Sequence, residues 1–170
     1  AQPCGPLLTG DGEGTMLDVT GNMSLTAITG TRDVVFTAGT GGIHIGGNLM
    51  IGPETNITYV TTAFTAGGGD VTIDGNLRIR EYGTGGATTF SSGAGTYTVH
   101  GTYTNENMDA GDVAWSTNST LYIDSTAAQT LPKVDSYYNL RLGPGGGAGT
   151  TFSLTSTIAS TYTLSGTLEI

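Results

Sequence analysis

The stretch GDVTIDGNLRI, residues 69–79, decides the fold of this chain. Its apolar residues form two alternating pairs: Val71, Ile73, Leu77 and Ile79. Alternation with a period of two places side chains of one kind on one face of a strand. Gly75 separates the two pairs, and a residue without a Cβ lets the backbone bend where another residue would clash. We therefore expect two short strands joined at a glycine corner, with the four apolar side chains pointing inward.

The same nine-residue pattern recurs along the chain, with mostly apolar residues at positions 1, 3, 7 and 9 and glycine at position 5. Its five copies are residues 17–25, 43–51, 71–79, 97–105 and 162–170. Residues 121–129 form a weaker copy with Ser125 at the glycine position, and the copies up to this one start 24 to 28 residues apart. A second column has the same period, because an aromatic residue precedes each following copy by six or seven residues: Phe36, Phe64, Phe90 and Trp115.

A fixed repeat of this length indicates stacked units, none of which buries its apolar face alone. Because the units are strands, the expected fold is all-β: a parallel β-solenoid of about six to seven coils, with 24–28 residues per coil. Residues 17–170 would form this single domain, and residues 1–16 an N-terminal arm. The aromatic column would form a stacked inner ladder on a third face. Position 6 carries polar residues that would hydrogen-bond amide to amide along the outside: Asn22, Asn48 and Asn76, then Thr102, Thr126 and Thr167.

The charge balance excludes several classes of partner. The chain has 14 acidic and 5 basic residues and a net charge of −9. Binding to nucleic acid or to an anionic membrane surface needs clustered cations, so neither is expected. No apolar run is long enough to insert into a bilayer. Cys4 is the only cysteine, which leaves no intrachain disulfide. The chain starts AQPCG without an initiator methionine, as a secreted protein does after signal-peptide removal, so we expect an extracellular location.

Residues 119–170 resemble repeats of bacterial secreted and surface β-solenoid proteins of the adhesin type. In those repeats a strand is followed by AQT with an apolar residue, then by YYNL and an alternating strand. The matching residues are Ala128, Gln129, Thr130, Leu131, Tyr137, Tyr138, Asn139 and Leu140, with SGTLEI closing the chain. The resemblance implies the architecture and an extracellular setting. The glycine run at 143–150 departs from the pattern and leaves the coil boundaries there open.

The two ends of the predicted solenoid favour self-assembly, because stacked coils expose unpaired backbone groups unless they are capped. The last 9 residues and the 16 residues before Leu17 add up to 25, which is one repeat. We expect copies to join head-to-tail into a filament, through stacked ends or strand addition. The alternatives are a monomeric solenoid and a fragment of a longer protein. The residues expected at the subunit contact are Pro6, Leu7, Leu8, Met16, Leu17, Tyr162, Leu164, Leu168 and Ile170.

Candidate metal sites are few. Position 4 carries Asp74, His100 and Asp124 on successive coils, and a histidine between two carboxylates could bind a metal or move a proton. A surface charge pairing is the commoner outcome of such a column. Calcium is the one cofactor that the sequence suggests, because carboxylates lie in glycine-rich loops at Asp11, Glu13 and Asp70. Glycine turns of this kind are more often metal-free.

Two features of the sequence are candidate sites for carbohydrate. Three acceptor sequons for N-glycosylation begin at Asn22, Asn56 and Asn118. Tyr137 and Tyr138 could line a sugar-binding patch, although adjacent strand residues point to opposite faces and one of the two is expected in the core.

An enzyme is not expected, because no pair of acids in a groove is indicated, and Arg78 and Arg80 are placed to pair with Glu81 or Glu106. Ice binding is also not expected, since the TYT triplets at 96–98, 102–104 and 161–163 do not form one column. The expected function is therefore a structural subunit of an extracellular filament or surface fibre. The alternative is a monomeric, glycan-binding adhesin module of a larger surface protein.

Overall fold

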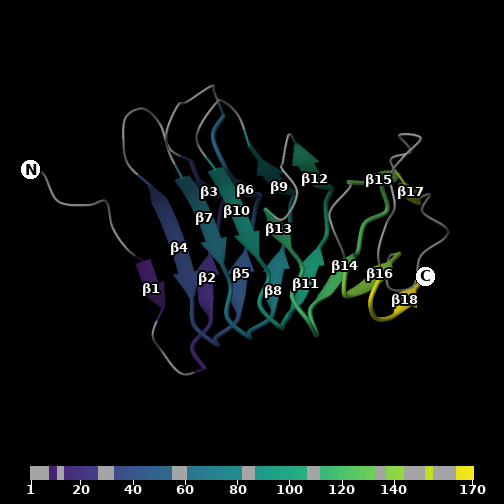
Figure 1. Cartoon of the computed structure of the whole chain (residues 1–170), viewed down its shortest axis with the longest axis horizontal. Helices are drawn as coiled ribbons and strands as arrows, with labels where there is room; N and C mark the ends of the chain where they lie inside the picture. Colours follow the sequence, from purple (N-terminus) through teal and green to yellow (C-terminus); the bar gives the residue numbers. More distant parts are fainter. Residues whose placement is uncertain are drawn as a thin grey trace, which may run out of the picture.

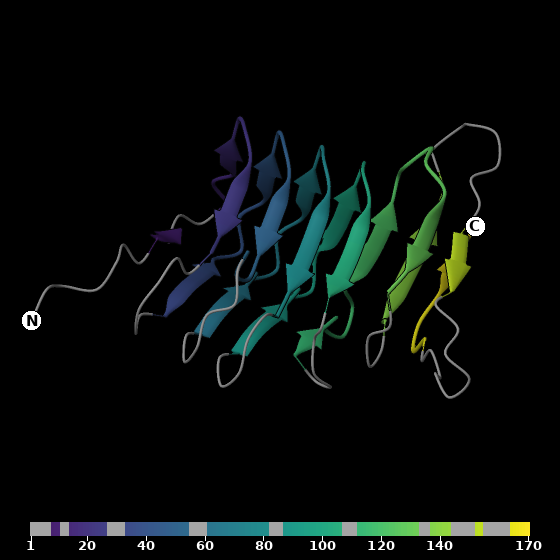
Figure 2. The same ribbon diagram turned by 90° about the horizontal axis from the view of Figure 1, so that it is seen from above.

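A computed structural model of the chain describes residues 8–10, 14–26, 33–54, 61–81, 87–106, 112–132, 137–143, 152–154 and 164–170. These residues form strands and no helix, and every strand pairing among them is parallel. Figure 1 shows the strands of successive turns side by side, and Figure 2 shows the turns following one another from the N-terminal to the C-terminal end. The predicted parallel β-solenoid is confirmed.

Three sheets form the sides of the solenoid. Sheet A contains β1 (Leu8–Gly10), β4 (Val34–Ala38), β7 (Thr61–Thr65), β10 (Ala87–Ser91) and β13 (Val113–Ala114). Sheet B contains β2 (Leu17–Val19), β5 (Ile43–Ile45), β8 (Val71–Ile73), β11 (Thr96–Val99), β14 (Thr120–Ile123), β16 (Asn139–Leu142) and β18 (Leu168–Glu169). Sheet C contains β3 (Met23–Leu25), β6 (Leu49–Ile51), β9 (Leu77–Arg80) and β12 (Tyr103–Glu106). A separate pair is formed by β15 (Gln129–Leu131) and β17 (Phe152–Leu154).

One turn of the chain through sheets A, B and C is called a rung below. The described residues form four complete rungs, β1 to β12, which is fewer than the six to seven coils predicted. Sheet B continues for three more strands, but among the described residues sheet C ends at β12. The prediction failed because it assumed that each copy of the pattern builds both sheets B and C, and this holds only for the first four.

The glycine corner lies where predicted, between sheets B and C. The four apolar residues of the opening stretch are fully buried: Val71, Ile73, Leu77 and Ile79. The Gly75 N–H donates to the Gly47 carbonyl and the Gly101 N–H to the Gly75 carbonyl, both at 2.9 Å, so these glycines stack in one column. A Cβ on Gly75 would lie 2.5 Å from Asn48 Oδ1 and 2.9 Å from the Gly47 carbonyl carbon and oxygen. Glycine is therefore needed because the previous rung lies so close.

The polar column beside these glycines makes a different hydrogen bond from the one predicted. Asn22 Oδ1 accepts the backbone N–H of Asn48, and Asn48 Oδ1 accepts that of Asn76, both at 2.8 Å. The series ends where the Thr102 N–H donates to Asn76 Oδ1 at 2.7 Å. The partner is thus the backbone of the next rung, not its side-chain amide. Each bond satisfies a corner N–H that lies outside the regular strand pairing.

The interior is filled by the predicted aromatic ladder. Phe36, Phe64 and Phe90 stack with ring centroids 5.1 and 5.6 Å apart, and Trp115 follows, tilted, at 5.1 Å from Phe90. Tyr137 extends the ladder by stacking on Trp115 at 6.2 Å. Tyr137 is buried and Tyr138 is half-buried, in keeping with the expected inward and outward pair.

The alignment of the last copy of the pattern was wrong. Residues 162–170 were expected to place Leu168 and Ile170 on the side after the glycine corner, where Leu77 and Ile79 lie in sheet C. Instead, Leu164 forms a bridge with Tyr137, and Leu168 and Glu169 pair with Leu140 and Arg141 in sheet B. The GTLEI segment therefore turns a corner that leads into sheet B, whereas the corner at Gly75 leads from sheet B into sheet C. The two corners read alike in sequence, because both need a glycine followed by an alternating strand.

Candidate functional site

The two ends of sheet B are the feature most relevant to function. β2 and β18 each pair with one neighbour among the described residues, so one side of each strand forms an edge of the sheet. Five large hydrophobic side chains are exposed in the part of the chain that the structure describes, and four of them lie at the two ends of sheet B. These four are Met16, 60% exposed, Leu164, 38%, Leu168, 52%, and Ile170, 91%. Edge strands with exposed apolar residues are surfaces on which further strands pair.

The residues predicted at the subunit contact divide between these two edges. Leu17 is half-buried in β2 and follows the exposed Met16, whereas the exposed Leu164, Leu168 and Ile170 lie at the other end. Leu8, in the segment expected to be an arm, belongs to β1 and pairs with Phe36 of the same chain. Pro6, Leu7 and Tyr162 lie outside the described residues.

A histidine that sequence reasoning did not single out connects the first three rungs on the outer face of sheet B. His44 Nδ1 lies 2.9 Å from Asp18 Oδ1, and His44 Nε2 lies 3.1 Å from Asp74 Oδ2. Both ring nitrogens face carboxylate oxygens, and only the imidazolium form can donate a hydrogen bond from each. The hydrogen bonds to Asp74 and Asp18 raise the pKa of His44 above its ordinary value. The signal was present in the sequence, since His44 falls in the outward position directly opposite Asp18.

The predicted trio of Asp74, His100 and Asp124 does not come together as a unit. His100 Nδ1 contacts Asp124 Oδ2 at 3.2 Å, but Asp74 contacts His44 instead. No group of three potential metal ligands is found in the described ranges, 8–170 with the gaps given above. The surface charge pairing given as the commoner outcome therefore holds for His100 and Asp124, whereas Asp74 pairs with His44 because the side chains at position 4 also reach the column at position 2, two residues earlier in the strand.

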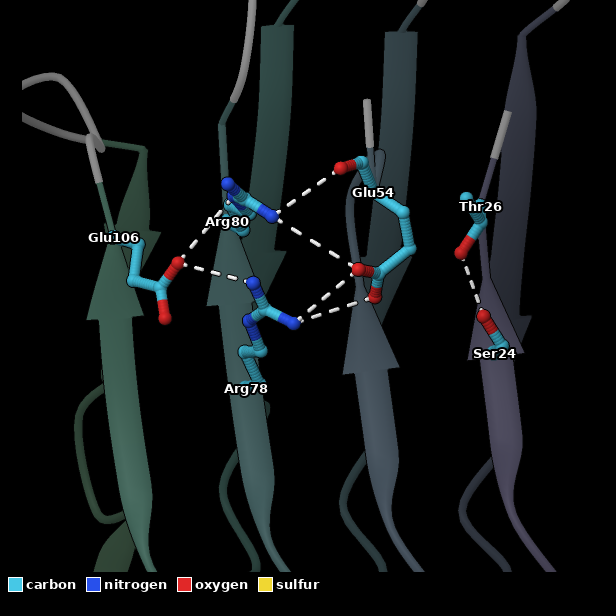
Figure 3. A network of polar contacts seen from close by, with 6 residues as sticks. All are labelled: Ser24, Thr26, Glu54, Arg78, Arg80 and Glu106. Carbon is cyan, nitrogen blue, oxygen red and sulfur yellow. Dashed lines mark hydrogen bonds and ion pairs between the residues drawn. The ribbon is translucent and has the colours of Figure 1, made fainter. Parts of the chain in front are cut away.

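The outer face of sheet C carries four charged residues that link three rungs (Figure 3). Arg78 lies between two carboxylates, with Nη1 3.3 Å from Glu54 and Nη2 3.2 Å from Glu106. Arg80 Nε lies 3.3 Å from the same Glu106, and its Nη1 donates to the Glu54 carbonyl at 3.4 Å. The expected pairing of both arginines with Glu106 is confirmed, and Glu54 is the partner that sequence reasoning missed. Charges matched in this way strengthen the contact between rungs, as a network rather than as isolated surface pairs.

A second charged contact lies at the C-terminal end of sheet B. The Arg141 guanidinium carbon lies 4.3 Å from the centre of the Tyr122 ring, and Arg141 Nε lies 3.3 Å from Glu169 Oε1. Tyr122, Arg141 and Glu169 share the outward column that begins with Asp18 and His44. Polar contacts thus run along this column at both of its ends.

Gln129 explains why sheet C ends at β12. Its side chain is buried, its Oε1 accepts the Tyr103 N–H at 3.2 Å, and its Nε2 donates to the Gly101 carbonyl at 2.6 Å. The side-chain amide thereby offers the donor and acceptor that the backbone of a fifth strand would have offered. The glutamine of the AQT segment therefore terminates the sheet, a role that the sequence pattern did not reveal.

The remaining candidate sites have the following surroundings. Asp70 Oδ1 accepts the Thr96 N–H at 2.8 Å, so this carboxylate bridges two rungs, while Asp11 and Glu13 lie outside the described residues. Of the sequons, Asn22 is exposed with its Oδ1 in the polar column, and Asn118 is exposed in a turn with φ of 70°. Asn56 lies outside the described residues.

With this geometry established, the class of protein that the fold defines is a three-sided parallel β-solenoid. No protein-family model, curated protein or solved structure matches the chain. The fold and the surfaces described above are therefore the basis for any functional conclusion. No helix in the described part of the chain is long and apolar enough to cross a membrane.

Proposed function

We propose that the chain is a structural subunit of an extracellular filament or surface fibre, in which copies stack head-to-tail through the ends of the solenoid. The extracellular placement rests on the resemblance of residues 119–170 to bacterial surface proteins. The observation that supports assembly is that exposed apolar side chains lie at both ends of sheet B: Met16 directly before the edge strand β2, and Leu164, Leu168 and Ile170 in and around the edge strand β18. Contact between two different ends is heterologous, and repeating it produces an open polymer rather than a closed ring unless the rotation closes.

Strand stacking also supplies a reason for the polymer to be stable. Within the chain, Leu17 and Val19 of β2 pair with Ile43 and Ile45 of β5. A strand added on the other side of β2 would bury apolar side chains in the same way and would pair the edge N–H and C=O groups. The exposed Leu168 of β18 offers an apolar side chain of the required kind.

The test is electron microscopy together with size-exclusion chromatography and light scattering of the purified 170-residue chain. We expect linear polymers of uniform width that grow with protein concentration. Leu168→Ser and Met16→Ser should each raise the concentration needed for polymers. Val35→Ser is the matched control, because Val35 is 41% exposed on sheet A away from both edges and should leave assembly unchanged. Monomers at millimolar concentration would reject the proposal, and monomers that bind a glycan array would favour an adhesin module instead.

A further inference from the structure

The outward column of sheet B places an acidic residue on each edge strand. Directly opposite residues in this column, from the first rung to the last, are Asp18, His44, Thr72, Thr98, Tyr122, Arg141 and Glu169. Asp18 has His44 as its neighbour on the inner side, and Glu169 has Arg141. The other side of both acidic residues faces the edge of the sheet.

The inference that follows rests on the proposed function. If sheet B continues from one copy to the next in the register it has within the chain, Leu168 lies opposite Leu17 of the next copy and Glu169 opposite Asp18. The inward-facing pair at the junction, Leu168 and Leu17, is then apolar, as the inward-facing pairs within sheet B are. At the corner, Thr15 would take the position that Gly41, Gly69 and Gly95 hold in the second to fourth rungs. Ser119 and Tyr138 hold this same position in later rungs, and sheet B runs through both without interruption.

This register brings two carboxylates together. Parallel strands lie about 4.8 Å apart, and like charges directly opposite one another across strands are unfavourable. We propose that copies of this chain join in this register through β18 and β2, and that acid strengthens the junction because Glu169 of one copy lies beside Asp18 of the next.

Two cationic groups lie beside the carboxylates of the junction, and the charge of one of them depends on pH. Arg141 is positive at every relevant pH and partly offsets Glu169. His44 offsets the negative charge of Asp18 only when the imidazole is protonated. The other carboxylate that contacts this ring, that of Asp74, lies at the opposite ring nitrogen. As the pH falls, His44 gains its charge first.

The first experiment measures the critical concentration for polymers from pH 5 to pH 8 at constant ionic strength. The scan stays above the isoelectric point of 4.2, where unspecific precipitation would interfere. We expect the critical concentration to fall by about two- to fivefold on going from pH 8 to pH 5. Glu169→Gln should reproduce the low value already at pH 8. Asp124→Asn is the matched control, because it removes one carboxylate from the middle of the same face and should behave as the unchanged chain does.

The second experiment tests the register by cross-linking. Asp18→Cys and Glu169→Cys are combined in a Cys4→Ser chain, since the expected spacing of opposite residues suits a disulfide. We expect a ladder of disulfide-linked oligomers, and only dimers or monomers from a control that combines Asp18→Cys with Tyr122→Cys. Polymers that show no pH dependence, or that fail to cross-link through 18 and 169, would overturn this inference and leave the filament intact. Absence of polymers and of cross-links under all conditions would overturn the filament itself.

Discussion

At the scale of single residues, the corner at Gly75 needs glycine because the preceding rung leaves no room for a Cβ, and not because the backbone there has an unusual conformation. Gly75→Ala would place a Cβ against Asn48 Oδ1 and the Gly47 backbone. Two rungs would then have to separate, and we expect the free energy of unfolding to fall by about 1–3 kcal/mol. Gly21→Ala is the control, because Gly21 occupies the same corner in the first rung and has no atom within 4 Å of an added Cβ. Urea unfolding of the two variants checks the difference; equal losses would contradict this explanation.

His44 should make the stability of the first rungs depend on pH. Its folded-state pKa lies above the unfolded value of 6.5, because hydrogen bonds to Asp74 and Asp18 favour the imidazolium. The stabilisation is therefore fully present below pH 6.5 and is lost as the pH rises through the folded-state pKa. The melting temperature of the unchanged chain should exceed that of His44→Gln at pH 5.5, and the gap should narrow above pH 8. Thr98→Gln, in the same outward column, is the control: its melting temperature should differ from that of the wild-type chain by an amount that does not vary with pH.

At the scale of elements, the end of sheet C is determined by one side chain. Gln129→Leu keeps a buried side chain of similar volume but leaves the Tyr103 N–H and the Gly101 carbonyl without their partner. A buried polar group without a partner costs about 1–3 kcal/mol, and we expect a loss of that size or more. Hydrogen exchange at the Tyr103 amide should accelerate as well. Thr130→Val, at the neighbouring exposed position, is expected to change the free energy of unfolding by less than about 0.5 kcal/mol.

The regular rungs could be predicted from the sequence, and the irregular C-terminal part could not. The corner at Gly75, the inward pairs on either side and the aromatic column follow from patterns repeated on neighbouring rungs, where one error would shift every side chain to the other face. The irregular rungs lack this repetition. Nothing in the sequence distinguishes a glycine corner that leads into sheet B from one that leads from sheet B into sheet C, so Leu168 was assigned to the wrong side of the solenoid. The role of Gln129 depends on a contact between rungs that the repeat does not contain, whereas the contact between His44 and Asp18 can be read by comparing position 2 of neighbouring copies.

At the scale of the whole molecule, each complete rung contacts its two neighbours and little else, so the solenoid should tolerate the loss of one rung. Deleting residues 43–70 removes 28 residues and joins Gly42 to Val71, which restores the same corner. Phe90 would then stack on Phe36 in sheet A, and the Asn76 N–H would meet Asn22 Oδ1. Stability in such a stack is approximately a sum of rung and interface terms.

We therefore expect the shortened chain to retain its β-type circular dichroism and to unfold cooperatively at a lower urea concentration. Deleting only residues 43–51 is the informative control. It removes fewer residues but takes β5 and β6 away, leaving β4 without the two sides that complete its turn. The smaller deletion should therefore lower the free energy of unfolding more than the larger one, because the unit of folding is the full rung. If the nine-residue deletion proved the more stable of the two, the rungs would not be the independent units that their stacking indicates.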